Sequence, residues 1–443
     1  MKEDFLHYLW RFKKFESSNL KTCNNEPLSI IDGGRYLQLS GPDFFNATIK
    51  LGKQKWAGNI EIHVKSSDWY LHRHQDDPAY ENVILHVVWE HDTPVFRKDN
   101  SEIPVLVLKD YTSQEIIDSY RQLMEPKSWI FCEPYLLRVD LFTITNWLER
   151  LFFERLERKS KAINAILSHN GNDWEAALFC LLAKNFGLNS NGELFFKIAT
   201  AIPFAVIRKE RHDPMRLEAL LFGFAGLLTG ESEDNYRKTL QETWHYLRQK
   251  HNLSPEHFGS PEFFKLRPDN FPTVRLSQLA QLYHGRENLF SALIQTDEVS
   301  AWMQVLTCGV SSYWETHYVF DRESPKKTKR ITPDFARLVL INTVVPMRFA
   351  YAQAFDRDVS DQLLSIMESV PAERNSVTER FSIAGIKAAN ALESQSMLQL
   401  RNEYCENRRC MECEIGNFLM RGLSPKNELN LKKIPTDVTR TPD

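Results

Sequence analysis

The sequence predicts an α+β fold, in which an N-terminal mixed sheet is followed by a large all-helical region. Apolar and polar residues alternate with period two through much of residues 30–110, as half-buried strands require. From residue 113 onward, the apolar residues instead recur at helical spacing. At 443 residues the chain is longer than one hydrophobic core usually serves, so we expect two or three structural units.

The first unit is predicted to be an α/β domain over residues 1–112. It opens with an amphipathic helix within residues 3–16, whose apolar side chains share one face and whose last residues are basic. About five strands then follow, in the segments SIIDGGRYLQL, NATIKL, GNIEIHV, NVILHVVWE and IPVLVL. The fourth segment is apolar on both faces, which is typical of a central strand covered on both sides.

Helices are predicted to fill the remainder of the chain. Residues 141–167 place apolar side chains on one face and Glu, Arg and Lys on the other, and residues 331–355 predict a buried helix interrupted at Pro346. We divide this region into helical domains over 113–300 and 301–423, the second of which ends in a cysteine cluster. Residues 424–443 are polar and predicted to be disordered.

Charge and composition exclude several classes of function. With 55 basic and 58 acidic residues, the formal net charge of −3 gives no general argument for binding nucleic acid or a membrane surface. The N-terminus lacks the apolar run of a secretory signal, and no stretch is long enough to span a bilayer. The 7 cysteines are an odd number, which favours reduced thiols. We therefore expect a cytoplasmic protein with no membrane partner.

A polar constellation lies on the predicted hairpin of the second and third strands. Alternation places Glu61, His63 and Lys65 on one face of a strand, and Asp43 precedes them by the interval that an antiparallel partner needs. Two carboxylates on neighbouring strands can bind a hard divalent cation, and a lysine beside them can orient a water molecule or a phosphate. We therefore predict a Mg²⁺ or Mn²⁺ site at Asp43 and Glu61. The alternative is a solvated strand face with cross-strand ion pairs.

These motifs resemble the core of the PD-(D/E)XK nuclease superfamily. In that pattern a carboxylate, a second acid and a lysine on a β-hairpin bind a divalent metal and cut phosphodiester bonds. Asp43 matches the first acid and Lys65 the lysine, whereas His63 stands where the pattern has an acid, and Glu61 on the same face is its substitute. The resemblance implies a metal-dependent nuclease or a nuclease-like nucleic-acid-binding protein, with Asp43, Glu61, His63 and Lys65 catalytic. A catalytically inactive scaffold of the same fold is the alternative.

A wider resemblance covers nearly the whole chain. It rests on the segments GPDFFNATI, WAGNIEIHVKSSDW, HRHQDDPAYENVILHVVWEHD, RLEALLFGFAGLL, RPDNFPTVRLSQLA and YCENRRCMECEIG. Together these segments are similar to a bacterial family known as domain of unknown function 2851. This resemblance implies homology along the chain and carries no established activity.

The loop after the hairpin is rich in metal-ligating side chains. Asp68, Trp69, His72 and His74 follow the lysine strand closely, and we expect them to form a wall of the same cleft that contacts substrate. Trp69 would stack on bases there, although a tryptophan is more often a core anchor. A remote alternative is a zinc hydrolase using the His72/His74 loop, because the H-x-H-x-D start of this segment superficially resembles that of metallo-β-lactamase-like hydrolases. In this sequence Asp77 stands where that resemblance implies another histidine.

Three cysteines near the C-terminus form a C-x4-C-x2-C motif at Cys405, Cys410 and Cys413. Thiolates at this spacing can bind one zinc ion or an iron–sulfur cluster, but three ligands are one short. The missing ligand could be Cys308, Cys23 or a distant histidine. The alternative is that the three are reduced thiols packed in the core.

Overall fold

The computed structural model describes residues 2–36, 41–124, 128–254 and 258–422. The chain forms two compact units, one from Met1–Leu148, Ser376–Lys387 and Met397–Asp443, and the other from Glu149–Asn375 and Ala388–Ser396. This division differs from the boundaries predicted near residues 112 and 300, because late segments of the chain return to pack in the first unit. Local periodicity carries no information about such a return. The predicted tail over 424–443 lies outside the described residues.

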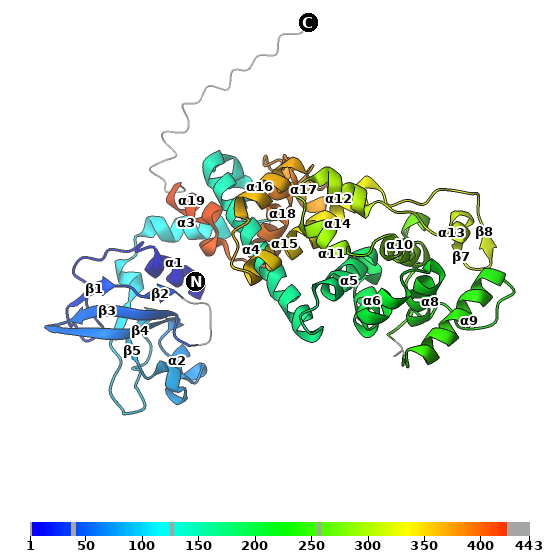
Figure 1. The fold of residues 1–443 in the computed structure, drawn as a ribbon. Helices are drawn as coiled ribbons and strands as arrows, with labels where there is room; N and C mark the ends of the chain where they lie inside the picture. The colour runs from blue at the N-terminus through cyan, green and yellow to red at the C-terminus, as the bar shows by residue number, and fades with distance from the viewer. Residues whose placement is uncertain (1, 37–40, 125–127, 255–257, 423–443) are drawn as a thin grey trace, which may run out of the picture. The chain divides into compact units, whose positions relative to one another are not determined.

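A mixed sheet is the centre of the first unit (Figure 1). Its strands are β1 (Leu28–Asp32), β2 (Arg35–Tyr36), β3 (Phe44–Leu51), β4 (Gln54–Lys65), β5 (Val83–Glu90) and β6 (Val105–Val107). The order is β1-β3-β4-β5-β6, with β2 also paired to β3. The pairs from β1 to β4 are antiparallel, whereas β4, β5 and β6 run parallel. The predicted α+β class and the predicted β3–β4 hairpin are confirmed.

An irregularity interrupts the β3–β4 hairpin beside Asp43. The pairing shifts register between Phe44 and Ala47, and Asn46 within this bulge has a φ of +56°. Asparagine tolerates this left-handed conformation better than most residues do, and the Asn46 backbone N–H donates to Asn59 Oδ1 at 3.2 Å. Bulges redirect side chains and are common beside functional sites. This one changes the strand alignment directly before the stretch that carries Glu61 and His63.

The middle of the sheet is covered on both faces. In β5, residues 83–88 are all buried, as expected of a central strand with parallel neighbours. In β4, residues 58–63 are also buried without interruption, so Glu61 and His63 are only 4% and 1% exposed. The alternative of a solvated polar face is therefore wrong for these two residues. Their polar atoms require partners inside the protein.

Helices and turns of the first unit cover this sheet. Helix α1 (Glu3–Arg11) packs with its apolar side chains inward, and the Trp10 indole donates to the Gly33 carbonyl at 2.9 Å. The connection from β4 to β5 contains α2 (Asp68–Leu71) and the single turns η1 (His74–Asp76) and η2 (Pro78–Tyr80). The other elements that lie in this unit or begin or end in it are η3 (Leu108–Tyr111), α3 (Gln114–Met124), η4 (Glu133–Arg138), α4 (Leu141–His169), α17 (Ser376–Ile383), α18 (Ala391–Gln399), η7 (Leu400–Cys405), η8 (Cys410–Glu412) and α19 (Glu414–Gly422).

The second unit is mostly helical and contains a large apolar core. Its remaining elements are α5 (Trp174–Phe186), α6 (Leu188–Ala201), α7 (Phe204–Glu210), α8 (Pro214–Phe224), α9 (Asn235–Lys250), η5 (Pro268–Asn270), α10 (Pro272–His284), α11 (Leu289–Ile294), α12 (Val299–Leu306), α13 (Ser312–Thr316), β7 (His317–Val319), β8 (Arg322–Glu323), α14 (Pro333–Val339), η6 (Leu340–Val344), α15 (Val345–Ala354) and α16 (Ser360–Ser369). The predicted interruption at Pro346 is observed, because a π-helical segment separates α14 from α15 and the proline lies in the first turn of α15. In the described part of the chain, no helix is both long and apolar enough to cross a membrane.

Candidate metal centre

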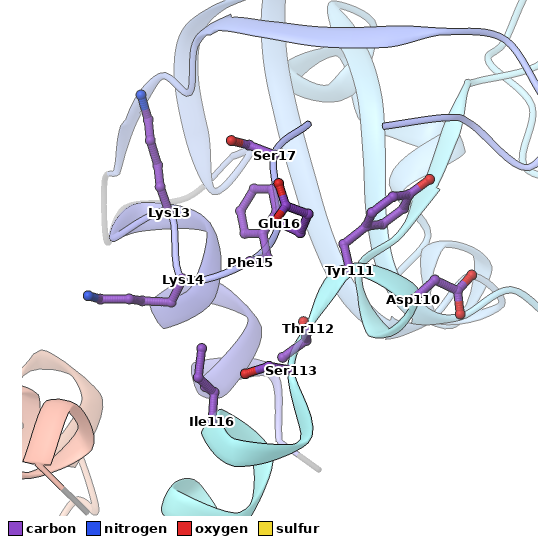
Figure 2. Close-up of a pocket in the computed structure, with 10 residues that line it drawn as sticks. All are labelled: Lys13, Lys14, Phe15, Glu16, Ser17, Asp110, Tyr111, Thr112, Ser113 and Ile116. Carbon is purple, nitrogen blue, oxygen red and sulfur yellow. The ribbon is translucent and has the colours of Figure 1, made fainter. Parts of the chain in front are cut away.

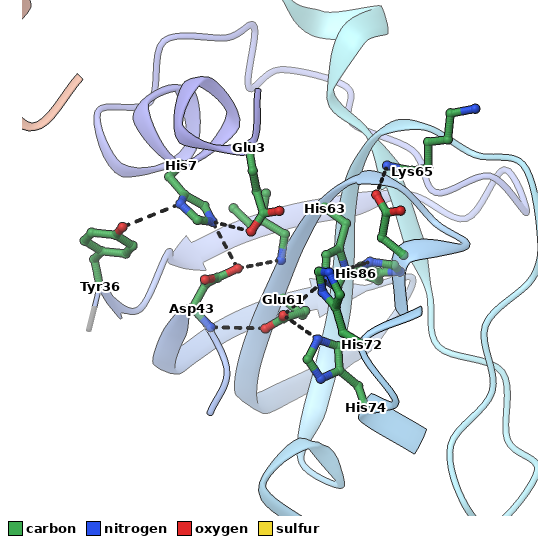
Figure 3. A network of polar contacts seen from close by, with 12 residues as sticks. Glu3, His7, Tyr36, Asp43, Glu61, His63, Lys65, His72, His74 and His86 are labelled. Atoms are coloured by element: carbon green, nitrogen blue, oxygen red, sulfur yellow. Dashed lines mark hydrogen bonds and ion pairs between the residues drawn. The ribbon is translucent and has the colours of Figure 1, made fainter. Parts of the chain in front are cut away.

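Five of the polar side chains predicted to form the site lie together at one place on the sheet (Figure 3). Asp43 precedes β3, while Glu61 and His63 lie on β4. The loop after β4 brings His72 and His74 to the same place. The structure therefore combines the predicted hairpin residues with the predicted histidine loop.

Two hydrogen bonds join Asp43 to the segment of β4 that carries Glu61. The Asp43 backbone N–H donates to Glu61 Oε2 at 3.1 Å, and the Ile62 backbone N–H donates to Asp43 Oδ2 at 3.0 Å. Each carboxylate therefore uses one oxygen to hold the other residue's strand. The second Glu61 oxygen faces the histidines, at 3.3 Å from His74 Nε2 and 3.5 Å from His63 Nε2.

His63 is the centre of a chain of imidazole rings. Its Nδ1 lies 2.9 Å from Nε2 of the buried His86 on β5, and its Nε2 lies 3.1 Å from Nδ1 of His72. A neutral imidazole has one N–H, so a hydrogen bond from His63 Nδ1 to His86 leaves the lone pair of His63 Nε2 directed at His72 and Glu61. A hydrogen bond at the other ring nitrogen is the usual way in which the ring of a metal-binding histidine is held in one orientation.

The backbone between His72 and His74 takes an unusual conformation. Arg73 has a φ of +58°, in the left-handed region that non-glycine residues rarely occupy. This turn places both flanking rings against His63, with centroid distances of 5.0 Å to His72 and 5.2 Å to His74. Strained backbone of this kind is often found at functional sites.

His63, His72 and His74 form a set that can hold a metal ion. One ring nitrogen of each lies within 4.8 Å of those of the other two. The buried His74 Nε2 has no hydrogen-bond partner among the described residues, although Glu61 Oε1 lies 3.3 Å away. A buried nitrogen left without a partner is costly unless another group binds it. Glu61 is the nearest carboxylate, so the set offers three nitrogens and one oxygen.

A second set of ligand atoms, which was not predicted from the sequence, lies beside the first. Glu3 and His7 on α1 point toward Asp43, and one ligand atom of each of these three residues lies within 4.8 Å of the others. His7 Nε2 is 3.1 Å from Asp43 Oδ2 and 3.7 Å from Glu3 Oε1. The available signal was the i,i+4 spacing of Glu3 and His7, which places both on one helical face.

Burial strongly perturbs the titration of this cluster. Desolvation, followed by the charge of Asp43, raises the pKa of Glu61 to about 9, and desolvation raises the pKa of Glu3 to about 7. Desolvation, followed by the neighbouring histidines, lowers the pKa of His63 to about 2. His63 is thus held neutral, as a metal ligand must be, and the clustered acids favour a cation beside it.

Lys65 does not join the cluster. Its side chain is 50% exposed, its Nζ lies 4.0 Å from Glu90 Oε2, and Figure 3 shows it directed away from Glu61 and His63. The prediction that Lys65 lies beside Glu61 and His63 is therefore wrong. Lys65 stands at the end of β4, where water solvates its ammonium group at little cost. Asp68 accepts a hydrogen bond from the Lys65 backbone N–H at 2.9 Å and so holds the strand end.

Trp69 was expected on the substrate-contacting wall, but it is 1% exposed. It packs among Tyr80, Val83, Val95 and Ile103, and its ring also contacts those of His74 and His86. The prediction that Trp69 stacks on bases is therefore wrong for this structure, because a large apolar ring on a short helix was enclosed by the neighbouring turns. Its position instead supports two histidines of the cluster.

The C-terminal cysteines lie together, and the two cysteines suggested as a fourth ligand do not join them. Cys308 Sγ donates to the Gln278 carbonyl in the second unit, and Cys23 is exposed. Cys132 instead lines the same cavity as Cys405, Cys410 and Cys413.

A larger cavity in the first unit does not bring polar side chains together at one point. It has a volume of about 590 Å³ and lies between the end of α1 and the segment that joins β6 to α3. Figure 2 shows Lys13 and Lys14 extending away from Asp110 and Tyr111. Size alone therefore does not make this cavity the functional site, since a site needs polar groups directed at one point.

The buried histidines predict a loss of stability in acid. Burial lowers the pKa of His86 from its ordinary value of 6.5 to about 3. Between these two pH values, His86 is therefore neutral in the folded protein but protonated in the unfolded chain. Stability from His86 is thus present above pH 6.5 and lost as the pH falls. We expect the stability advantage of the metal-free wild type over His86→Gln to shrink by about 2 kcal/mol between pH 7.5 and 4.5. Urea unfolding in EDTA measures this, and parallel pH profiles would contradict it.

A comparison with protein families gives one match. The family model described as protein of unknown function (DUF2851) matches residues 3–376. No curated protein and no solved structure matches this chain. The match includes both ligand sets on the sheet, whereas Cys405, Cys410 and Cys413 lie beyond it.

Proposed function

The chain belongs to the DUF2851 family, and we propose that it is a divalent-metal-dependent hydrolase of phosphodiester bonds, a nuclease or nuclease-like enzyme. The observation that carries this proposal is the convergence of Glu61 with His63, His72 and His74 inside the first unit. Glu61 and His63 are buried, and the buried Nε2 of His74 has no hydrogen-bond partner among the described residues, so this arrangement costs stability unless it binds something.

The donor atoms favour a transition metal. Imidazole nitrogens with one carboxylate suit Mn²⁺, Fe²⁺, Co²⁺ or Zn²⁺, whereas Mg²⁺ prefers oxygen ligands and bound water. Of the cations predicted from sequence, Mn²⁺ thus fits better than Mg²⁺. A site with Zn²⁺ would also use the His72/His74 loop. The nuclease-like metal site and the zinc hydrolase site predicted from the sequence would therefore lie at the same place.

Asp43 gives the site a second position. It lies between Glu61, to which it is hydrogen-bonded, and the Glu3–His7 pair of α1. Two adjacent ligand sets joined by carboxylates are typical of phosphoesterases and nucleases, in which the ions polarise the phosphate and lower the pKa of a bound water. Glu3, His7 and Asp43 would hold an ion in this second position, where it would supply the same polarisation of phosphate and water.

The phosphodiester substrate follows from the resemblance to the PD-(D/E)XK core, with a changed alignment. The superfamily places an acid two residues before its lysine, and Glu61-Ile62-His63 has this spacing with histidine in the lysine position. This alignment uses the two buried residues and omits Lys65, which is exposed. Asp43 keeps the role of the first acid on the neighbouring strand.

A binding-only protein is the second candidate, and the position of Lys65 favours it. If catalysis required the lysine of the superfamily, its displacement from the cluster would leave a fold that binds metal or nucleic acid without turnover. The assay below tests the first candidate, because a protein that only binds metal or nucleic acid would show no cleavage with any metal.

Cleavage assays test the proposed activity. The full-length protein is stripped with EDTA, reloaded with Mg²⁺, Mn²⁺, Co²⁺ or Zn²⁺, and incubated with labelled single- and double-stranded DNA and RNA. We expect cleavage with a transition metal, a loss of at least about 100-fold in His63→Ala, and less than about a threefold change in Lys65→Ala. Equal loss in both variants would refute the assignment of His63 over Lys65. No cleavage with any metal would refute the hydrolase.

A further inference from the structure

Four cysteines from separate segments of the first unit surround one small cavity. Cys132 directly precedes η4, Cys405 ends η7, Cys410 begins η8, and Cys413 directly precedes α19. The cavity has a volume of about 20 Å³. Its other lining residues are mainly apolar: Ile130, Leu136, Phe381, Leu400, Tyr404, Ile415 and Gly416. Soft sulfur ligands are thus gathered in an enclosure that offers a hard cation little else.

The four sulfurs are neither paired nor in contact around a single point. All four cysteines are free thiols. Among the described residues, the sets of three whose ligand atoms lie within 4.8 Å of one another are the two at the sheet, and no three of these cysteines make such a set. Tetrahedral zinc needs thiolates about 3.8 Å apart, given Zn–S bonds of about 2.3 Å. Every group of three among these cysteines therefore includes at least one pair of sulfurs more than 4.8 Å apart, which is wider than the spacing of thiolates around one zinc ion.

We propose that Cys132, Cys405, Cys410 and Cys413 bind an iron–sulfur cluster. Four cysteine thiolates are the usual ligand set of such a cluster, and the inorganic core separates them more widely than one zinc ion does. Cys132 supplies the ligand that the C-x4-C-x2-C motif lacks. The site is separate from the histidine cluster, and this assignment does not depend on the proposed hydrolase.

The backbone around Cys413 suits a thiolate ligand. The backbone N–H groups of Ile415 and Gly416 are directed at the Cys413 sulfur as hydrogen-bond donors. Hydrogen bonds to sulfur are among the features that tune bound clusters. A Cβ at Gly416 would lie 1.9 Å from the Cys410 carbonyl oxygen, so only glycine lets α19 approach the Cys410 segment this closely.

Neutral core thiols explain the arrangement less well. Core cysteines need no common cavity, as Cys180 shows by packing singly in the second unit. A cluster would instead join the Cys132 segment to a C-terminal segment far away in the sequence, and a cross-link of this kind restricts the unfolded chain most when the loop is long.

Metal analysis of the full-length protein tests the proposal. After anaerobic purification, we expect about two to four iron atoms per chain, an equal amount of acid-labile sulfide, and the visible absorbance of a thiolate-bound cluster. Cys132→Ser is expected to lower iron and sulfide about tenfold. Cys308→Ser is the matched control, since Cys308 is similarly half-buried but lies outside the cavity, and it should retain both.

Each alternative outcome has a clear meaning. Wild-type protein without iron and sulfide would overturn the cluster, and one equivalent of zinc in its place would assign the four thiolates to a single ion instead. Unchanged iron in a folded Cys132→Ser variant would overturn the assignment of the fourth ligand. If that variant fails to fold by circular dichroism, the metal content of Cys405→Ser and of the wild type still decides between these outcomes.

Discussion

Replacing Glu61 with glutamine is expected to weaken Mn²⁺ or Zn²⁺ binding by at least about 100-fold and to raise the stability of the metal-free protein at alkaline pH. Binding falls because glutamine removes the carboxylate that lies 3.3 Å and 3.5 Å from the His74 and His63 nitrogens. The volume of the side chain is almost unchanged, so the packing of β4 is preserved. Isothermal titration with each metal measures the loss.

The gain in stability follows from the direction of the pKa shift. Burial and Asp43 raise the pKa of Glu61 from an ordinary 4.5 to about 9, so between these values the folded protein holds a proton that the unfolded chain has lost. Metal-free stability therefore falls as the pH rises through this window. Glutamine does not titrate, and we expect the variant to exceed the wild type by about 1–3 kcal/mol at pH 8 in EDTA.

This prediction is specific because Glu61→Gln should lower the metal affinity while it raises the stability of the metal-free protein. A purely structural Glu61 would give a variant with lower stability and no metal dependence in either protein. Lys65→Ala serves as the matched control from the same strand, since its exposed side chain should change neither metal affinity nor stability by more than about 0.5 kcal/mol. A Glu61→Gln variant that binds metal as tightly as the wild type would contradict the site.

The sequence specified the hairpin well because strand alternation is a local property. Asp43, Glu61 and His63 were correctly placed together, since the spacing of two antiparallel strands fixes which residues meet. Lys65 shares their alternation, but its exposure depends on what covers the end of β4, and periodicity does not encode this. The same limit explains Trp69, whose burial depends on the turns that follow it.

Residues supplied by distant elements could not be located from the sequence. Glu3 and His7 reach Asp43 only because α1 packs against the sheet, and Cys132 meets the C-terminal cysteines only because the end of the chain returns to the first unit. His72 and His74 were noticed as a motif, but their approach to His63 requires the left-handed backbone of Arg73. That conformation is rare for arginine and has no sequence signature.

Trp69→Ala is expected to lower the free energy of unfolding by about 3–5 kcal/mol, as the loss of a fully buried aromatic ring does. The ring lies 5.9 Å from that of Tyr80 and 5.4 Å from that of His74, so its removal leaves a cavity directly beneath the histidine loop. Metal affinity should fall with stability, because His74 loses the surface that orients it. Urea unfolding followed by metal titration at a temperature where the variant is folded measures both effects.

Two further substitutions distinguish this structural role from contact with substrate. Trp69→Phe keeps most of the packing and removes an indole N–H that has no hydrogen-bond partner among the described residues, so we expect a cost below about 1.5 kcal/mol. Trp56→Ala on the same sheet removes a ring that is 38% exposed and should cost less than about 1 kcal/mol. If Trp69→Ala instead left stability unchanged and raised the KM for a nucleic acid, Trp69 would belong to the substrate surface, and the enclosed position described for it would be wrong.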